Sequence, residues 1–343
     1  MDSNHESPRA LDPSGGVTAT TACERCGAPL SGDVQYCFRC GRPHQFHSHP
    51  TIQRIWWRIL VVGVVLYWVL VKLLEGSGNP NLFPTVILIG AFLVPVTFVV
   101  YLYESGALYD VPIPTVALTF FYGGVLAIIA AQLLEQQLVA GMGFLSLLAV
   151  GFSEELAKPL GVLWLVRRHE YAGELHGLVL GAAAGMGFAA LETMGYGFTF
   201  LLMSKGSLAV LGQVLLTRGL LAPLGHGTWT AIVVGTVWRE RMRGKHWLNW
   251  RTAKGFGIAV ILHTLWDWTA TAVPIDLPLP GLLLHWRFID LVIPAIGLPI
   301  PGLIIGAIGL WILWGMFRES ERVDAAAASP VGDRAILPPA SAV

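Results

Sequence analysis

Charged residues are scarce in this sequence. Asp, Glu, Lys and Arg make up 13% of the 343 residues, whereas they make up about 25% of a typical soluble domain. Hydrophobic residues account for 54%, and the mean hydropathy is +0.62. The shortage of charge excludes an ordinary soluble globule and indicates a polytopic membrane protein.

The sequence also lacks an excess of charge of either sign, and it lacks a recognisable signal peptide. With 22 basic and 22 acidic residues the net charge is +0, so we expect no nucleic-acid partner. The first 50 residues are polar. They contain no basic segment followed by an apolar stretch and a small-residue cleavage site, so we expect no cleaved signal peptide.

Long apolar runs begin at Ile55 and recur as far as Phe317. About 20 apolar residues in a helix cross the ~30 Å hydrocarbon core of a bilayer. We therefore predict an all-α polytopic membrane protein, a bundle of about eight transmembrane helices, with residues 276–290 as a loop or a re-entrant segment. The predicted spans are residues 55–74, 83–103, 113–134, 142–166, 175–202, 208–238, 255–273 and 291–317.

Basic residues cluster at four places beside these spans. Cytoplasmic loops are enriched in Lys and Arg, and eight spans place all four clusters on one side of the membrane. We therefore expect both termini to be cytoplasmic. The clusters are Arg54 with Arg58, Arg167 with Arg168, the group Arg239, Arg241, Arg243, Lys245, Arg251 and Lys254, and finally Arg318.

All four cysteines lie near the N-terminus, in two Cys-x-x-Cys pairs separated by ten residues: Cys23, Cys26, Cys37 and Cys40. This spacing resembles a zinc ribbon, in which four thiolates hold one Zn²⁺ and leave no position for substrate, so we expect a structural zinc. Two disulfides are disfavoured by a reducing cytoplasm, and a redox pair would need a βαβ context that is lacking here.

The predicted domain organisation follows from these patterns. We expect a disordered N-terminus over residues 1–20, a small zinc-ribbon module over residues 21–43 and a linker over residues 44–54. A transmembrane helical domain follows over residues 55–318, and a disordered tail over residues 319–343.

The predicted fourth span contains Glu154, Glu155 and Lys158. On a helix, Lys158 lies one turn from both glutamates and can reach either carboxylate. The two glutamates point about 100° apart, so we expect them to do different jobs. One carboxylate would stay paired with Lys158, while the other would act as a general base. The structural alternative is an ion pair that only locks helix packing.

Other spans carry ionisable residues as well. Such residues at membrane depth usually face a protein interior or a cavity and mark functional sites. His226 lies in the sixth predicted span, and His263 lies in the seventh, one turn before Asp267, which can orient it. Glu192 in the fifth can join the group, although it lies deeper in its span, or it can pair with Arg218.

The order of these motifs is similar to that of the PrsW family of intramembrane proteases, which is related to the CAAX-processing and abortive-infection group. The resemblance covers residues 73–273. It consists of Glu154-Glu155-x-x-Lys158, Phe188-x-x-x-Glu192, Arg218 followed by His226 and Trp229, and His263 with Trp266 and Asp267. Asp267 departs from the pattern, since Asn is more frequent there in the family.

The resemblance implies cleavage of a single-pass membrane protein, such as an anti-sigma factor in bacterial envelope signalling, by an enzyme of the bacterial cell membrane. Our hypothesis is that Glu154, or else Glu155, activates a water. His226 and His263 then bind a catalytic Zn²⁺ or another divalent metal, or stabilise the oxyanion. Lys158 orients a carboxylate, and Glu192 is a metal ligand or a positioning group.

Two other classes of function stay open on the sequence. A membrane scaffold or adaptor would recruit a cytoplasmic partner through the zinc ribbon and would tolerate neutral glutamates. A proton- or ion-coupled transporter would use the buried charges as a relay. The two halves of the sequence show no convincing internal repeat, which disfavours the transporter.

Overall fold

The computed structural model describes residues 54–105, 111–139, 143–165, 173–270 and 300–328, together with six short strands. The chain divides into two compact units, Met1–Ile52 and Gln53–Val343. In the first unit, β1 (Thr21–Ala22) pairs with β2 (Pro29–Leu30) as an antiparallel ladder. The four cysteines lie outside the described residues, so the zinc ribbon stays a prediction.

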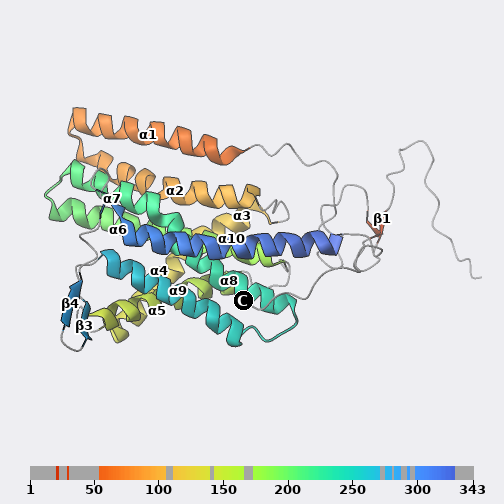
Figure 1. Ribbon diagram of the computed structural model, residues 1–343. Coiled ribbons are helices and arrows are strands. Elements are labelled where there is room, and N and C mark those ends of the chain that lie inside the picture. The colour runs from red at the N-terminus through yellow and green to blue at the C-terminus, as the bar shows by residue number, and fades with distance from the viewer. Residues whose placement is uncertain are drawn as a thin grey trace, which may run out of the picture. The chain divides into compact units, whose positions relative to one another are not determined.

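The second unit is a bundle of helices that run side by side (Figure 1). Three short helical segments accompany the main helices: η1 (Pro80–Leu82), the π-helical turn η2 (Thr119–Gly123) and η3 (Ala222–Leu224). The main helices are α1 (Ile55–Ser77), α2 (Phe83–Ser105), α3 (Ile113–Leu118), α4 (Gly124–Leu138), α5 (Phe144–Leu165), α6 (Glu174–Met203), α7 (Leu208–Leu221), α8 (His226–Met242), α9 (Trp250–Ala270) and α10 (Ile300–Ala328).

Within the described residues, six helical segments are long and apolar enough to cross a membrane. They confirm a helical membrane protein but number fewer than the eight predicted spans. The other two predicted spans correspond to α5 and α9, which have 22 and 21 residues but carry charged side chains. The six segments are Ile55–Ser77, Pro80–Ser105, Ile113–Leu138, Glu174–Met203, Leu208–Met242 and Ile300–Ser320.

Helix α6 lies at the centre of the bundle, and most of its residues are buried. Gly177, Gly181 and Gly185 recur every fourth residue along one face, where α8 packs directly on the α6 backbone. Small residues at this spacing allow two membrane helices to approach closely. A Cβ at Gly185 would overlap the carbonyl oxygen of His226, so the glycine lets the beginning of α8 lie directly against α6.

The structure differs from the sequence expectations at three places. The sixth predicted span is not one helix, because Ala222–Leu224 forms a 3-10 turn that separates α7 from α8. The last span begins at Ile300 rather than at residue 291. The segment before it contains two antiparallel strand pairs, β3 (Ile275–Leu279) with β4 (Leu282–Trp286) and β5 (Val292–Ile293) with β6 (Leu298–Pro299). Helix α10 continues to Ala328, inside the predicted tail.

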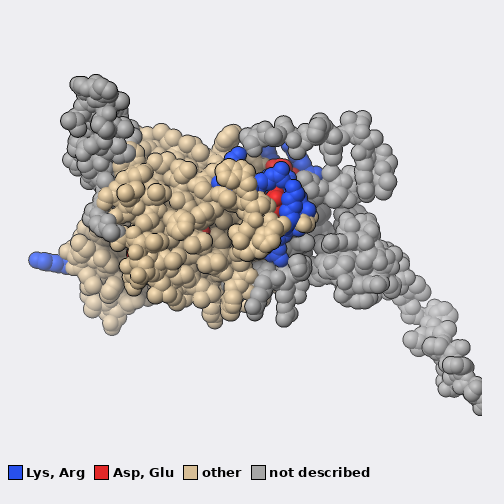
Figure 2. Space-filling view, turned by 90° about the horizontal axis from the view of Figure 1, so that it is seen from below, with Lys and Arg blue, Asp and Glu red and all other residues tan. Residues whose placement is uncertain are grey.

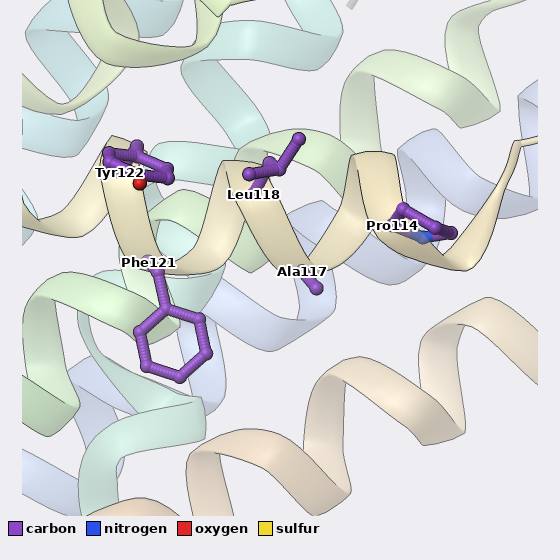
Figure 3. Close-up of a pocket in the computed structure, with 5 residues that line it drawn as sticks. All are labelled: Pro114, Ala117, Leu118, Phe121 and Tyr122. Atoms are coloured by element: carbon purple, nitrogen blue, oxygen red, sulfur yellow. The ribbon is translucent and has the colours of Figure 1, made fainter.

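A shallow hollow on the surface of α3 and η2 is distinct from the ionisable cluster described below. Its lining residues follow one helical face (Figure 3): Pro114, Ala117, Leu118, Phe121 and Tyr122. Leu118, Phe121 and Tyr122 are exposed large side chains. The lining is apolar apart from the Tyr122 hydroxyl, as expected for a surface in contact with lipid, and it offers no group for acid–base chemistry.

Candidate functional site

Helix α5 contributes a buried charge cluster from a single turn. The Nζ atom of Lys158 lies 3.0 Å from Oε2 of Glu154 and 2.7 Å from Oε1 of Glu155. Lys158 is fully buried, and its Nζ lies 4.3 Å from the centre of the Phe188 ring, an aromatic contact from α6. The lysine therefore holds both carboxylates in fixed positions, as the helical spacing predicts.

Helix α9 contributes His263 to the same cluster. Its Nδ1 atom lies 2.9 Å from Oε1 of Glu155, and its Nε2 atom lies 3.7 Å from Oε2 of Glu154. The Trp229 ring stacks on the imidazole with 4.8 Å between ring centres. A hydrogen bond on one ring nitrogen determines which nitrogen is free to bind a metal or a proton. Glu155 thus directs the Nε2 atom of His263 toward Glu154.

His226 enters the site because the helix is interrupted just before it. The break at η3 makes His226 the first residue of α8, packed against Gly185 of α6. Its two ring nitrogens face different groups: Nδ1 lies 2.8 Å from Nζ of Lys158, and Nε2 lies 3.1 Å from Oε2 of Glu192. The two histidine rings lie 5.1 Å apart between centres.

Glu192 belongs to the cluster even though it lies deeper in its predicted span. Its Oε2 atom accepts a hydrogen bond of 2.6 Å from Arg218 of α7 and also faces His226. Arg218 lies 4.0 Å above the Tyr196 ring and 3.4 Å from the hydroxyl of Thr193. The pairing with Arg218 and the contact with the site are therefore not alternatives, since one carboxylate oxygen makes both.

Three side chains in this cluster fit a metal ion. One ligand atom each from Glu154, His226 and His263 lies within 4.8 Å of the others. Oε2 of Glu154 is 3.9 Å from Nδ1 of His226 and 3.7 Å from Nε2 of His263. Two ligands of a tetrahedral zinc are separated by about 3.4 Å, given metal–ligand distances near 2.1 Å. The separations of 3.7 and 3.9 Å between these atoms are slightly longer than that value.

The donor set also suits a catalytic metal. Two imidazoles and one carboxylate leave a fourth position for water or substrate. Asp267 lies beside the set, with Oδ2 3.3 Å from Nε2 of His263. Lys158 also borders the set, with Nζ 2.8 Å from Nδ1 of His226.

The cluster is buried on one side and open on the other. Glu155, Lys158 and His263 are inaccessible, and Glu154 is nearly so. Glu192, Asp267 and Arg218 have side chains that are 21, 26 and 30% exposed. Glu192, Asp267 and Arg218 therefore form the partly exposed edge of the cluster.

The structure brings together all seven residues that the sequence indicates as a catalytic group: Glu154, Glu155, Lys158, Glu192, His226, His263 and Asp267. Sequence reasoning missed the supports around them. The roles of Phe188 below Lys158 and of Trp229 against His263 were not foreseen, nor were Thr193 and Tyr196 beside Arg218. The close packing at Gly185 is indicated in the sequence, because small residues are frequent over residues 181–197.

A buried carboxylate–imidazole site with an open side, inside a bundle of membrane helices, defines a polytopic membrane protein equipped for metal-assisted hydrolysis. Comparison with known families agrees. The profile described as PrsW family intramembrane metalloprotease matches residues 111–293, just over half of the chain. The chain belongs to the PrsW family. No curated protein and no solved structure matches it.

Family membership makes the chain a peptidase of the intramembrane metalloprotease type and an integral membrane protein. It also implies that the substrate is a membrane protein within the bilayer. The matched residues include every member of the ionisable cluster, from Glu154 to Asp267. The matched range begins later and ends later than the sequence resemblance, which runs over residues 73–273.

Proposed function

We propose that this chain hydrolyses a peptide bond of a single-pass membrane protein, with Glu154 as the central catalytic carboxylate. The observation that carries the proposal is the position of Oε2 of Glu154, which faces an imidazole nitrogen of both His226 and His263. Separations of 3.7 and 3.9 Å are too long for direct hydrogen bonds. A water or a cation between the three groups would contact all of them.

In the proposed reaction, Glu154 accepts a proton from a water whose oxygen bonds to the scissile carbonyl carbon. The imidazoles of His226 and His263 face the oxyanion that forms. As the carbon–nitrogen bond breaks, the proton held by Glu154 passes to the departing amine. Each proton taken from water thus ends on a product, and the carboxylate is restored.

The residues that would hold a metal are His226 and His263, and the Glu154 carboxylate lies beside them as the base rather than as a ligand. A bound Zn²⁺ or other divalent ion would polarise the carbonyl and make water more acidic. The sequence is compatible with Glu192 as a metal ligand or as a positioning group. Its contacts with Arg218 and with Nε2 of His226 favour the positioning role. We assign Glu155 to the orientation of His263, Lys158 to that of both carboxylates, and Asp267 to the open edge of the site.

We further propose that α5 and α9 also cross the membrane, which gives eight spans and places both termini in the cytoplasm. A bundle in which charged residues face one another can carry them at membrane depth. The proposed boundaries follow the sequence except near the C-terminus, where α10 extends the domain: a disordered segment over residues 1–20, a zinc ribbon over 21–43, a linker over 44–54, the protease domain over 55–328 and a tail over 329–343. The ribbon would hold zinc with its four cysteines and bind a cytoplasmic partner, and the substrate would be an anti-sigma factor of a bacterial envelope.

The test is cleavage of a single-pass membrane protein reconstituted with the full chain in vesicles. Glu154→Gln, Glu155→Gln, His226→Ala and His263→Ala are each expected to lose most of the activity, while the α1 surface variant Glu75→Gln keeps it. Gel filtration and thermal unfolding confirm that the variants are folded. Undiminished cleavage by all four site variants would end the peptidase assignment for this cluster.

A further inference from the structure

The connection between α8 and α9, called the α8–α9 loop here and taken as residues 239–254 with the last turn of α8 and the first turn of α9, carries a dense group of basic side chains. Between residues 239 and 254 there are six Lys or Arg residues and one acidic residue, Glu240. Figure 2 shows Lys and Arg gathered at one end of the described surface, around a few acidic atoms. The basic residues are Arg239, Arg241, Arg243, Lys245, Arg251 and Lys254.

A buried carboxylate gives this loop a fixed shape. Glu240 is 1% exposed and accepts hydrogen bonds from Arg243 at 2.7 Å, Asn249 at 2.8 Å and Arg251 at 3.4 Å. The backbone nitrogen of Lys245 donates to the carbonyl of Glu240 at 3.1 Å. The loop is therefore held by its own interactions, and its outward-facing side chains form a preorganised surface.

Apolar side chains project from the same loop. Trp247, Leu248 and Trp250 are 40, 63 and 80% exposed. Tryptophan is enriched where membrane helices leave the hydrocarbon core, because its amphipathic ring is stable at the level of the lipid headgroups. Exposed tryptophans beside lysines at the end of two membrane helices match the boundary between acyl chains and headgroups.

The basic charge of the loop is only partly neutralised. Glu240 is shared by Arg243 and Arg251, and Arg239 pairs with Glu174 and Glu319. Lys245 and Lys254 are exposed, and within the described part of the chain neither makes an ion pair. Two lysines without a carboxylate partner, beside rigid arginines, provide charge complementary to phosphate groups.

We infer that the α8–α9 loop is a binding surface for anionic phospholipid headgroups, with Lys245 and Lys254 contacting the phosphates and Trp247 and Trp250 lying among the headgroups. A juxtamembrane Lys or Arg gains affinity for an anionic leaflet. The loop connects the helices that carry His226 and His263, so a bound lipid also braces those two helices. This inference does not depend on the proposed peptidase activity.

The test compares lipids on the full chain in a neutral detergent. Phosphatidylglycerol is expected to raise the midpoint of thermal unfolding more than phosphatidylcholine does, with an effect that weakens as salt is added. In the double variant Lys245→Gln/Lys254→Gln, the apparent affinity for phosphatidylglycerol is expected to fall roughly 10-fold or more. The matched control Lys72→Gln/Lys205→Gln removes two exposed lysines elsewhere in the bundle and is expected to bind as the wild type does.

Three results would overturn the inference. The first is equal stabilisation by the charged and the neutral lipid. The second is an unchanged affinity in Lys245→Gln/Lys254→Gln, or an equal loss in the control variant. The third is full reproduction of the effect by inorganic phosphate alone, which would make the surface a general anion site. Retention of phosphatidylglycerol in native mass spectra provides an independent readout that does not require unfolding.

Discussion

The Nδ1 atom of His263 lies 2.9 Å from Oε1 of Glu155, and both side chains are buried. The same oxygen accepts from Lys158 at 2.7 Å. Within the described residues, the other carboxylate oxygen of Glu155 has no hydrogen-bond partner. These contacts support our proposal that Glu155 orients His263, and Glu154 is the carboxylate that faces both imidazoles.

The first prediction separates the two glutamates. Glu154→Gln is expected to lower kcat by about 10² to 10⁴, the range for loss of a general base. Glu155→Gln keeps the shape of the side chain but weakens its hold on His263, so a smaller loss of about 10- to 100-fold is expected. Single-turnover cleavage in vesicles measures the rate lost in each of the two variants. Equal losses in the two variants would contradict the division of roles.

Arg218 is expected to act through Glu192. Arg218→Gln removes the 2.6 Å hydrogen bond to Glu192, so His226 loses a fixed partner and kcat is expected to fall about 10-fold or more with a smaller change in KM. Arg218→Lys keeps the charge and should restore part of the rate. Lys205→Gln is the control. A pure rise in KM for Arg218→Gln would instead indicate a substrate-binding role.

Two glycines of α6 provide a matched pair. A Cβ at Gly185 would overlap the carbonyl oxygen of His226, whereas a Cβ at Gly195 meets no atom within 4 Å. Gly185→Ala is expected to cost about 1 to 3 kcal/mol of stability through overpacking and to displace His226. Gly195→Ala should leave stability and cleavage close to those of the wild type. Thermal unfolding measures the stability of both variants, and the cleavage assay measures their activity. Equal stability and equal cleavage in the two variants would contradict the packing of α8 on α6.

The four cysteines are expected to hold a zinc of their own. Replacement of Cys23, Cys26, Cys37 and Cys40 by Ser should remove about one zinc per chain, because four thiolates complete a structural site. Cleavage by the membrane domain should persist, since its site lies in a separate compact unit. Elemental analysis and the cleavage assay check the two parts of this prediction. Unchanged zinc content in the cysteine variant would exclude the ribbon.

The membrane helices were largely predictable because their apolar length has one physical cause, the thickness of the bilayer. The clustering of the seven ionisable residues was also predictable, since ionisable groups at membrane depth usually face the protein interior and one another. The break between α7 and α8 was less so. Pro223 and Gly225 mark it in the sequence, but membrane helices often tolerate such residues without interruption.

The contacts between helices could not be derived from the sequence. Residue count places Glu192 deeper in its span than the other ionisable residues, yet its carboxylate meets His226 at the beginning of α8. The packing of Trp229 on His263 and of Phe188 below Lys158 likewise depends on how three separate helices cross. Residue spacing gives positions along one helix and says nothing about the crossing of two.

The most direct test of the central claim is the metal content of the full-length chain in which the four cysteines are replaced by Ser. The account predicts about one divalent metal per chain, lost together with cleavage when His226 and His263 are both changed to Ala. It also predicts that Glu154→Gln keeps this metal while it loses cleavage. Full cleavage activity in a protein without metal, or metal that remains bound after both histidines are replaced, would contradict it.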